Sequence, residues 1–291
     1  MKEQTGPARS TSEQTLLDRI VRTVGDLPTM PAVANMVLDK ISDPNTTAKQ
    51  LHEIISQDQA LAARVLRIAN SPFYGCTKNI TRLTDAIVLM GFNSIRSLVM
   101  TSVLHDFFKS FGLAEKLLWE HSIGCAAASR RVATLIRYPR VEEAFLAGLL
   151  HDIGKVVLNL KLPDQMLKIV QEVYNTPGTS FQELEQKLLG FDHAQIGEQI
   201  AHKWHFAREI EETIGNHHQP QRAKAAPVVC CIINLANALC HKLEIGPTRN
   251  PNLDMMRVIG TRALKLSSAR IDQLLEEITQ VMESQRQAVF S

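Results

Sequence analysis

The chain has 291 residues, of which 45% are hydrophobic, 21% charged and only 5% aromatic, and its formal net charge is +2. These values are typical of a soluble globular protein with one large or two modest cores. A near-neutral charge gives no indication of a broad basic face, and the few aromatic residues argue against a base-stacking platform. Neither nucleic acid nor an anionic membrane is therefore an expected partner.

The cysteines, the polar N-terminal residues and the shortness of the longest apolar run predict a cytoplasmic protein. There are five cysteines, an odd number without a CxxC motif, which favours reduced thiols over disulfides or a zinc ribbon. Residues 1–14 are polar and lack the apolar centre of a signal peptide. The longest apolar run, 227–239, is interrupted by Asn234 and Asn237 and is too short to span a bilayer.

Apolar residues recur at helical spacing along nearly the whole chain. In the first part of the chain this spacing predicts helices over 16–24, 33–41 and 59–69. Thr46 or Thr47 is the expected N-cap of a further helix after the Asp43-Pro44-Asn45 stop, and Asp58 that of the helix at 59–69.

A turn-rich loop at 70–75 is followed by predicted helices over 83–89 and 95–108, with a break at Gly91. The longest pattern covers 114–136, and Pro139 then starts a helix that ends at His151. The remaining predicted helices are 163–174, 181–188, 194–204, 207–216, 225–243 and 271–289. No alternating pattern of useful length occurs, so the sequence predicts an all-α fold.

The sequence has two candidate domain boundaries, one near Phe111-Gly112 and one in the proline-containing loop at 246–251. They predict a tail and first helix (1–25), an N-terminal helical half (26–111), a histidine-bearing half (112–245) and C-terminal helices (246–291). Neither boundary has the length of a flexible linker, so the halves are expected to pack together.

The residues most informative about function are His151 and Asp152, which lie side by side at the end of an apolar helix. Further ligand candidates are His121 before it, and His193 and the adjacent pair His217-His218 after it. Imidazoles and a carboxylate that converge on one pocket suit a first-row metal centre, which supplies hydroxide near neutral pH and holds a phosphate. Asp152 projects about 100° from His151 on a helix and could bridge to a second ion. Lys155 lies four residues after His151 and could hold a substrate phosphate.

Each of these residues also has a purely structural interpretation. The His151-Asp152 pair could cap a helix C-terminus, and His121 could be a satisfied core histidine. His193 could simply open a helix behind the N-cap Asp192, and His217-His218 could face solvent. The remaining histidines lie on a predicted surface stripe or have no predicted partner: His202 and His205 belong to the first kind, and His52, His105 and His241 to the second.

The histidine series resembles the HD superfamily of metal-dependent phosphohydrolases. The N-terminal half resembles the HDOD domain, the HD-related output domain, in LPTMP (27–31), DQAL (58–61), LRIANSPFYG (66–75), DAI (85–87) and LMGF (89–92). The resemblance covers roughly residues 27–220. It implies a multi-helix bundle of HD-domain type with an N-terminal helical subdomain. It also implies a bacterial signalling module, a group in which many members have lost metal ligands and catalysis is not general.

Three departures from the HD pattern decide what is expected of the site. Asn237 occupies the place of the pattern's last aspartate, so one ion loses an anionic ligand. His217-His218 is followed by Gln219-Pro220-Gln221 and not by the glycine-tyrosine-proline motif of the branch that cleaves cyclic dinucleotides. Leu117 stands where a third ion would need a carboxylate. A mono- or dinuclear site therefore remains plausible, and cyclic-dinucleotide cleavage is not expected.

Three hypotheses of function remain open. The first is an output module that binds signalling proteins or a small phosphorylated ligand. In this module one or two ions of iron, manganese, nickel or zinc would stabilise the fold. The second is a phosphohydrolase acting on a nucleotide or phosphodiester, with Asp152 and Lys155 as its catalytic residues. The third is a metal-free helical adaptor. Phe73 and Tyr74 form a weak candidate surface for a partner, and the interpretation that they pin their loop to the core is favoured over it. The sequence gives no oligomeric state.

Overall fold

The computed structural model describes residues 32–71, 80–107, 112–204 and 206–290. Within these ranges the regular elements are helices and no strand occurs, which confirms the predicted all-α class. The predicted tail and first helix (1–25) and the loop residues Phe73 and Tyr74 lie outside the described residues. The proposed division of the chain at 111 and 245 stays a prediction.

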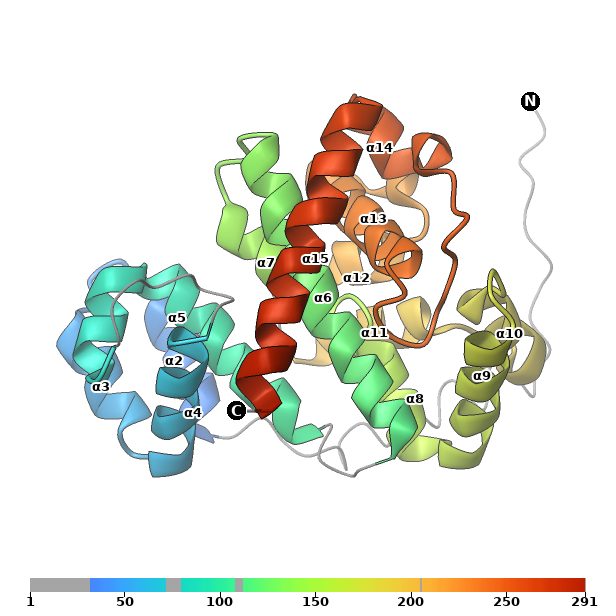
Figure 1. The fold of residues 1–291 in the computed structure, drawn as a ribbon. Coiled ribbons are helices and arrows are strands. Elements are labelled where there is room, and N and C mark those ends of the chain that lie inside the picture. Colours follow the sequence, from blue (N-terminus) through green and yellow to red (C-terminus); the bar gives the residue numbers. More distant parts are fainter. Residues whose placement is uncertain (1–31, 72–79, 108–111, 205, 291) are drawn as a thin grey trace.

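The N-terminal helices form a group at one side of the molecule, coloured blue to teal in Figure 1. They are α2 (Ala32–Ile41), α3 (Ala48–Ile55), α4 (Gln59–Ala69) and α5 (Leu83–Phe107). A capping box formed by Thr47 and Gln50 begins α3, and the Asp58 carboxylate accepts the Leu61 amide at 2.9 Å to begin α4. Both predicted N-caps are therefore confirmed.

Helix α5 is bent at Gly91, where the backbone adopts φ 77° and ψ 165°, outside the helical region. Only glycine adopts this conformation readily, so the predicted break is confirmed. Among the described residues, Leu83–His105 is the one helical stretch long and apolar enough to cross a membrane. It packs against α2, α3 and α4. Of its most apolar 18-residue stretch, 56% is buried, as in a core helix.

The centre of the molecule consists of α6 (Leu113–Leu135), α7 (Val141–Leu150) and α13 (Pro227–Lys242). The C-terminal helix α15 (Ser268–Phe290) lies along α6, as Figure 1 shows. These helices share a core that includes Val132, Ile233 and Ile278. Burial of such apolar side chains is the main force that holds the bundle together.

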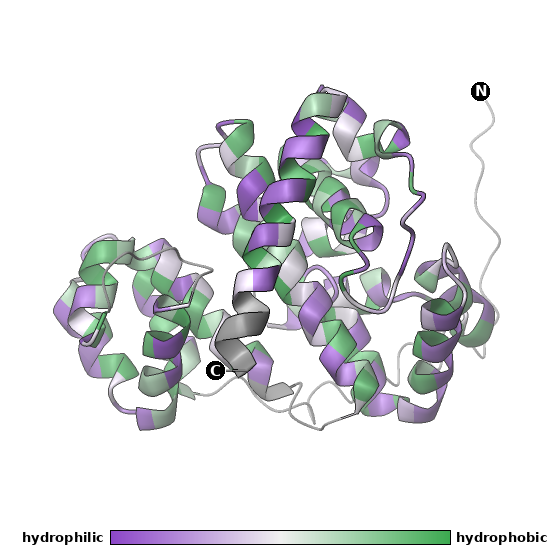
Figure 2. Cartoon of the chain, viewed as in Figure 1, coloured by the Kyte–Doolittle hydropathy of each residue, from purple (hydrophilic) through white to green (hydrophobic). Residues whose placement is uncertain are grey.

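All but the last of the remaining larger helices share an apolar cluster that includes Val157, Met166 and Phe191, and the last one places Ile214 in the core of the N-terminal helices. In Figure 2 hydrophobic and hydrophilic residues alternate along the helices, as expected when each buries one face. These helices are α8 (Ile153–Lys161), α9 (Pro163–Asn175), α10 (Phe181–Leu189), α11 (His193–Lys203) and α12 (Arg208–Asn216).

The structure corrects the sequence prediction at the end of α7. Helix α7 ends at Leu150, and α8, which was not predicted, begins at Ile153, so His151 and Asp152 form the junction between two helices. Gly154 weakened the helical pattern here, yet the fold requires it: a Cβ at this position would overlap the His193 carbonyl. The short elements α14 (Ile259–Ala263), η2 (Pro220–Arg222) and η3 (Met255–Arg257) were also not predicted.

Candidate metal centre

Five separate segments bring the predicted ligands into the interior of the bundle. His121 comes from the middle of α6, His151 and Asp152 from the α7–α8 junction, His193 from the start of α11, His217 and His218 from the end of α12, and Asn237 from α13. Of these, only His218 is not fully buried; the other side chains belong to residues at most 6% exposed. The structure thus brings together all seven residues that the sequence nominated as metal ligands.

The Asp152 carboxylate lies at the centre of the group and its two oxygens face different histidines. Oδ2 lies 3.4 Å from Nε2 of both His121 and His151. Oδ1 lies 3.2 Å from His193 Nε2 and 3.6 Å from His217 Nε2. This carboxylate could therefore serve one ion on each side, as a bridging ligand does.

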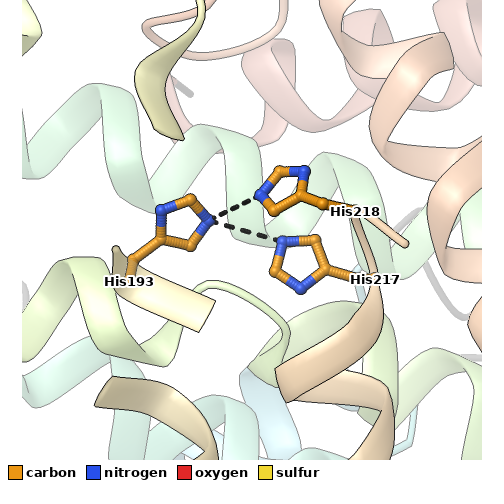
Figure 3. Close-up of side chains that lie close together, drawn as sticks. All are labelled: His193, His217 and His218. Carbon is orange, nitrogen blue, oxygen red and sulfur yellow. Dashed lines mark hydrogen bonds between the residues drawn. The ribbon is translucent and has the colours of Figure 1, made fainter. Parts of the chain in front are cut away.

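Two clusters of donors result. One consists of His121, His151 and Asp152, and the other of His193, His217 and His218; within each, the donor atoms lie within 4.8 Å of one another. Figure 3 shows the second cluster, with the His193 ring pointing at both neighbours. Its Nε2 lies 3.4 Å from His217 Nε2 and 2.9 Å from His218 Nε2.

Hydrogen bonds on the far side of the rings fix their orientation. Nδ1 of His121, His151 and His217 donates to the carbonyls of Ile245 (3.0 Å), Gly148 (2.7 Å) and Ile214 (2.7 Å), respectively. A proton on Nδ1 leaves the Nε2 lone pair free and aimed at the cluster. Ligating histidines in metalloproteins are held in this way by second partners.

Several buried polar atoms in the centre have no hydrogen-bond partner. They are Nε2 of His121 and His151, Oδ1 of Asp152 and Oδ1 of Asn237. Buried polar atoms are rarely left unsatisfied, because the loss of hydration costs free energy. A cation coordinated by these atoms would satisfy them, so the residues present fit a metal ion.

The electrostatics keep most of the imidazoles neutral, as metal ligation requires. Burial lowers the pKa of His121, His151 and His218, and lowers that of His217 to about 3. Burial acts to raise the pKa of Asp152, but the nearby His151 and Lys155 hold it well below its usual value, so the carboxylate is ionised.

His193 differs from the other histidines because a second carboxylate lies against it. Glu185 on α10 is fully buried, and its Oε2 accepts hydrogen bonds from the His193 backbone amide (2.9 Å) and from Nδ1 (2.5 Å). Burial alone would lower the pKa of His193, but the Glu185 charge outweighs it and raises the pKa to about 9. The sequence prediction missed Glu185. The signal was a carboxylate between Phe181 and Leu189 on the buried face of α10.

Lys155 lies beside the candidate ligands, in contact with Asp152, and its predicted phosphate contact stays a prediction. Lys155 pairs with Asp152, three residues before it, at the start of α8. Its Nζ lies 2.6 Å from Asp152 Oδ2 and 4.4 Å from the centre of the Phe181 ring, and the side chain is buried. The ammonium group thus lies against the carboxylate that the metal centre would share.

His241, predicted to have no partner, does have one. Its ring stacks on that of His121, with centroids 5.5 Å apart and an interplanar angle of 21°. His241 lies four residues after Asn237 on α13, a spacing that places both on one helix face. That spacing was the signal in the sequence. For His193 both predicted roles hold. It opens α11 behind the N-cap Asp192, and its imidazole also lies in the second group of candidate ligands.

A polar pocket of about 550 Å³ opens beside the second cluster. Among the seven nominated ligands, His218 is the one that lines it. The pocket carries three carboxylates and one guanidinium, and the other side chains are mostly amides. Its charged lining residues are Glu183, Asp192, Glu198 and Arg222.

A curated relative from Treponema pallidum, an uncharacterised protein, is 24% identical to the chain over 208 residues. The match covers 68% of this chain and 39% of that protein, so the chain corresponds to well under half of its relative's length. Such a match provides no activity to transfer.

Three solved structures share the fold. An HDOD domain protein of unknown function from Geobacter sulfurreducens is 25% identical, with a TM-score of 0.79 over 95% of this chain and 97% of that one. A Shewanella amazonensis SB2B protein named as a candidate phosphohydrolase is 24% identical, with a TM-score of 0.70 over 92% and 97%. A Marinobacter aquaeolei VT8 protein named as a candidate signal transduction protein is 20% identical, with a TM-score of 0.75 over 94% and 64%.

The sequence pattern of the HDOD domain family matches residues 27–220, which is more than half of the chain. The matched range includes the N-terminal helices, the α7–α8 junction and the histidine pair at the end of α12. Together with the shared fold, this match shows that the chain belongs to the HDOD domain family.

Proposed function

We propose that the protein is a signal-transduction output module in which a metal centre stabilises the helical bundle and catalysis is weak or absent. The observation that carries the proposal is the burial of the donor set. A phosphodiester must contact the ion to be cleaved, but His121, His151, His193 and His217 are at most 1% exposed and Asp152 is 4% exposed. An ion enclosed by protein ligands is typical of structural sites, whereas catalytic sites keep a coordination position open.

The chemistry of the donors also supports a structural role. Asn237 can offer only a neutral carbonyl oxygen, so the centre has a single carboxylate, that of Asp152, among its nominated ligands. When bound, a first-row metal ion lowers the pKa of a coordinated water and polarises a phosphoryl oxygen. In this chain Lys155 is already engaged by Asp152 and is not free to hold a phosphate.

Partners of the module would be signalling proteins or a small phosphorylated ligand in the bacterial cytoplasm. The pocket beside His218 has the volume of a small-molecule site. Its three carboxylates outnumber the single guanidinium of Arg222, which disfavours ligands with several negative charges. A ligand with one phosphate and several hydroxyl or amino groups would match this lining best.

A metal-dependent phosphohydrolase is the second candidate function, and one observation favours it. His218 reaches both the second donor cluster and the pocket, so a substrate bound in the pocket could approach an ion held there. Asp152 would then hold the ion, and Arg222 would contact the phosphate. A metal-free adaptor is the third candidate. The unsatisfied buried atoms argue against it, because a bundle without a metal gains nothing from leaving them unpaired.

A turnover assay separates the first two functions. The 291-residue chain, saturated with Mn²⁺, Fe²⁺ or Zn²⁺, is offered bis(p-nitrophenyl) phosphate, with Asp152→Asn as the matched control. The output-module proposal expects at most slow release of p-nitrophenol by the wild type, close to the rate of the control. Rapid release that requires Asp152 and added metal would establish the phosphohydrolase instead.

A further inference from the structure

The polar pocket beside the second cluster contains charged groups that the chain satisfies and others that it does not. Asp192 is of the first kind: its Oδ2 accepts hydrogen bonds from Gln182 Nε2 (2.8 Å) and Gln186 Nε2 (2.9 Å). Its Oδ1 accepts the Gln195 backbone amide at 3.0 Å. A carboxylate with three such hydrogen bonds gains little from a ligand. The charged lining residues that remain open to a ligand are Glu183, Glu198 and Arg222.

The same hydrogen bonds fix the orientation of the amides that line the pocket. A carboxylate oxygen can only accept, so Gln182 and Gln186 both turn their NH2 groups to Asp192. In the same way Asn216 Nδ2 donates to the Glu212 carbonyl at 3.0 Å. Each of these three amides keeps a carbonyl oxygen and one N–H for other partners. That combination suits hydroxyl groups, which both donate and accept hydrogen bonds.

Glu198 provides a carboxylate without a cation. Its side chain extends from α11 to the last turn of α12, where Oε2 lies 2.7 Å from the position that a Cβ on Gly215 would take. Burial, followed by the charges of Glu211 and Glu212, raises the pKa of Glu198, and among the described residues no cation offsets these effects. The residue is exposed as a whole, so a ligand can reach it. A positive group bound beside Glu198 would relieve the repulsion.

Arg222 provides the opposite charge. It belongs to η2, shortly after the histidine pair, and is exposed. None of the salt bridges among the described residues involves its guanidinium, which is therefore available to an anion such as a phosphate. Among the described lining residues there is no Phe, Tyr or Trp, so a nucleobase would find no such ring to stack on.

We propose that this pocket binds an amino sugar phosphate, a compact ligand that carries one ammonium group, one phosphate and several hydroxyl groups. Glu198 pairs with the ammonium group, Arg222 pairs with the phosphate, and the three amides contact the hydroxyls. The ammonium group also lowers the net negative charge of the ligand, which suits a pocket with more carboxylates than guanidinium groups. The proposal rests on the proposed output module with a small phosphorylated ligand, and it assigns the group by which the pocket selects that ligand.

Two sugars that differ in one group test the proposal. Glucosamine 6-phosphate has an ammonium group where glucose 6-phosphate has a hydroxyl. Each is titrated into the 291-residue chain at pH 7 and followed by calorimetry. The wild type is expected to bind glucosamine 6-phosphate about three- to tenfold more tightly, the effect of one charge pair in a partly exposed site.

Three variants separate the roles of the charged groups. Glu198→Gln keeps the shape of the side chain and is expected to lose the preference for the amino sugar. Arg222→Gln is expected to weaken the binding of both sugars by the same factor. Both positions are exposed, so these variants should fold, which a melting curve would verify. Glu283→Gln removes one charge at an exposed position of α15 outside the pocket and should bind both sugars as the wild type does.

The outcomes distinguish this proposal from the proposed function. Equal affinity of the wild type for the two sugars, or an unchanged preference in Glu198→Gln, would overturn the role of the ammonium group and leave a pocket for phosphorylated ligands. Binding of neither sugar would overturn the assignment of the ligand altogether. Rapid release of inorganic phosphate from either sugar would contradict the output module, while the two affinities would still decide the proposal.

Discussion

Glu185 is fully buried and is not one of the nominated metal ligands, so its substitution tests how His193 is held in position. Glu185→Gln keeps the shape of the side chain and removes its charge. The variant loses a charge-assisted hydrogen bond to His193 Nδ1, a bond of a kind worth about 1.5–3 kcal/mol. We expect the affinity for Co²⁺ or Zn²⁺, corrected for the proton that His193 releases on binding, to fall about 10- to 100-fold, the usual effect of removing such a support.

The same substitution should change the protonation of His193. Without the Glu185 charge, burial dominates and the pKa of His193 falls from about 9 to below its ordinary value. Nuclear magnetic resonance of the histidine ring protons in the metal-free protein would follow this change, and a competition titration with a chromophoric chelator would measure the affinity.

The matched control is Glu183→Gln, an exposed position on the same helix. The control should bind metal as the wild type does. If Glu185→Gln also bound metal with wild-type affinity, the idea that Glu185 positions His193 would be wrong.

Three further predictions concern stability. Gly154→Ala places a Cβ against the His193 carbonyl and should cost about 1–3 kcal/mol of unfolding free energy in denaturant titrations; an unchanged midpoint would refute the close approach of α8 and α11. Removal of metal with a chelator should lower the unfolding free energy by about 4 kcal/mol if the free ion stood at about 1,000 times its Kd, and calorimetry should show a lower Tm. In the metal-free protein the raised pKa of His193 means that the folded state holds a proton which the unfolded chain releases near its ordinary pKa of about 6.5. This contribution, at most about 3 kcal/mol, is complete below that pH and is lost as the pH rises through about 9. A flat stability profile over that range would contradict the Glu185–His193 pair.

The helices and their caps could be predicted from the sequence because they depend on local chemistry. Thr47 and Asp58 satisfy amides within three residues, and Gly91 provides a backbone conformation that other residues avoid. Helix α8 could not be predicted in this way. Gly154 reduces its local helical propensity, and the reason for the glycine is a contact with α11, about 40 residues further along the chain.

The seven metal-ligand candidates could be chosen from the sequence because imidazole and carboxylate groups are rare in apolar surroundings. The structure brings all seven close together. Their relations to other residues could not be derived. Lys155 pairs with Asp152 at a spacing of three residues, and helical spacing alone did not decide between this partner and His151, four residues before Lys155. Glu185 and His241 acquire their roles from helices that meet only in the folded protein.

Elemental analysis of the 291-residue chain, purified without an affinity tag or chelator, tests the central claim most directly. The account predicts one or two first-row metal ions per chain, restored by added metal after chelation. Less than about a tenth of an ion per chain, with no recovery on adding metal, would contradict it and leave a helical signalling adaptor whose histidines bind no metal.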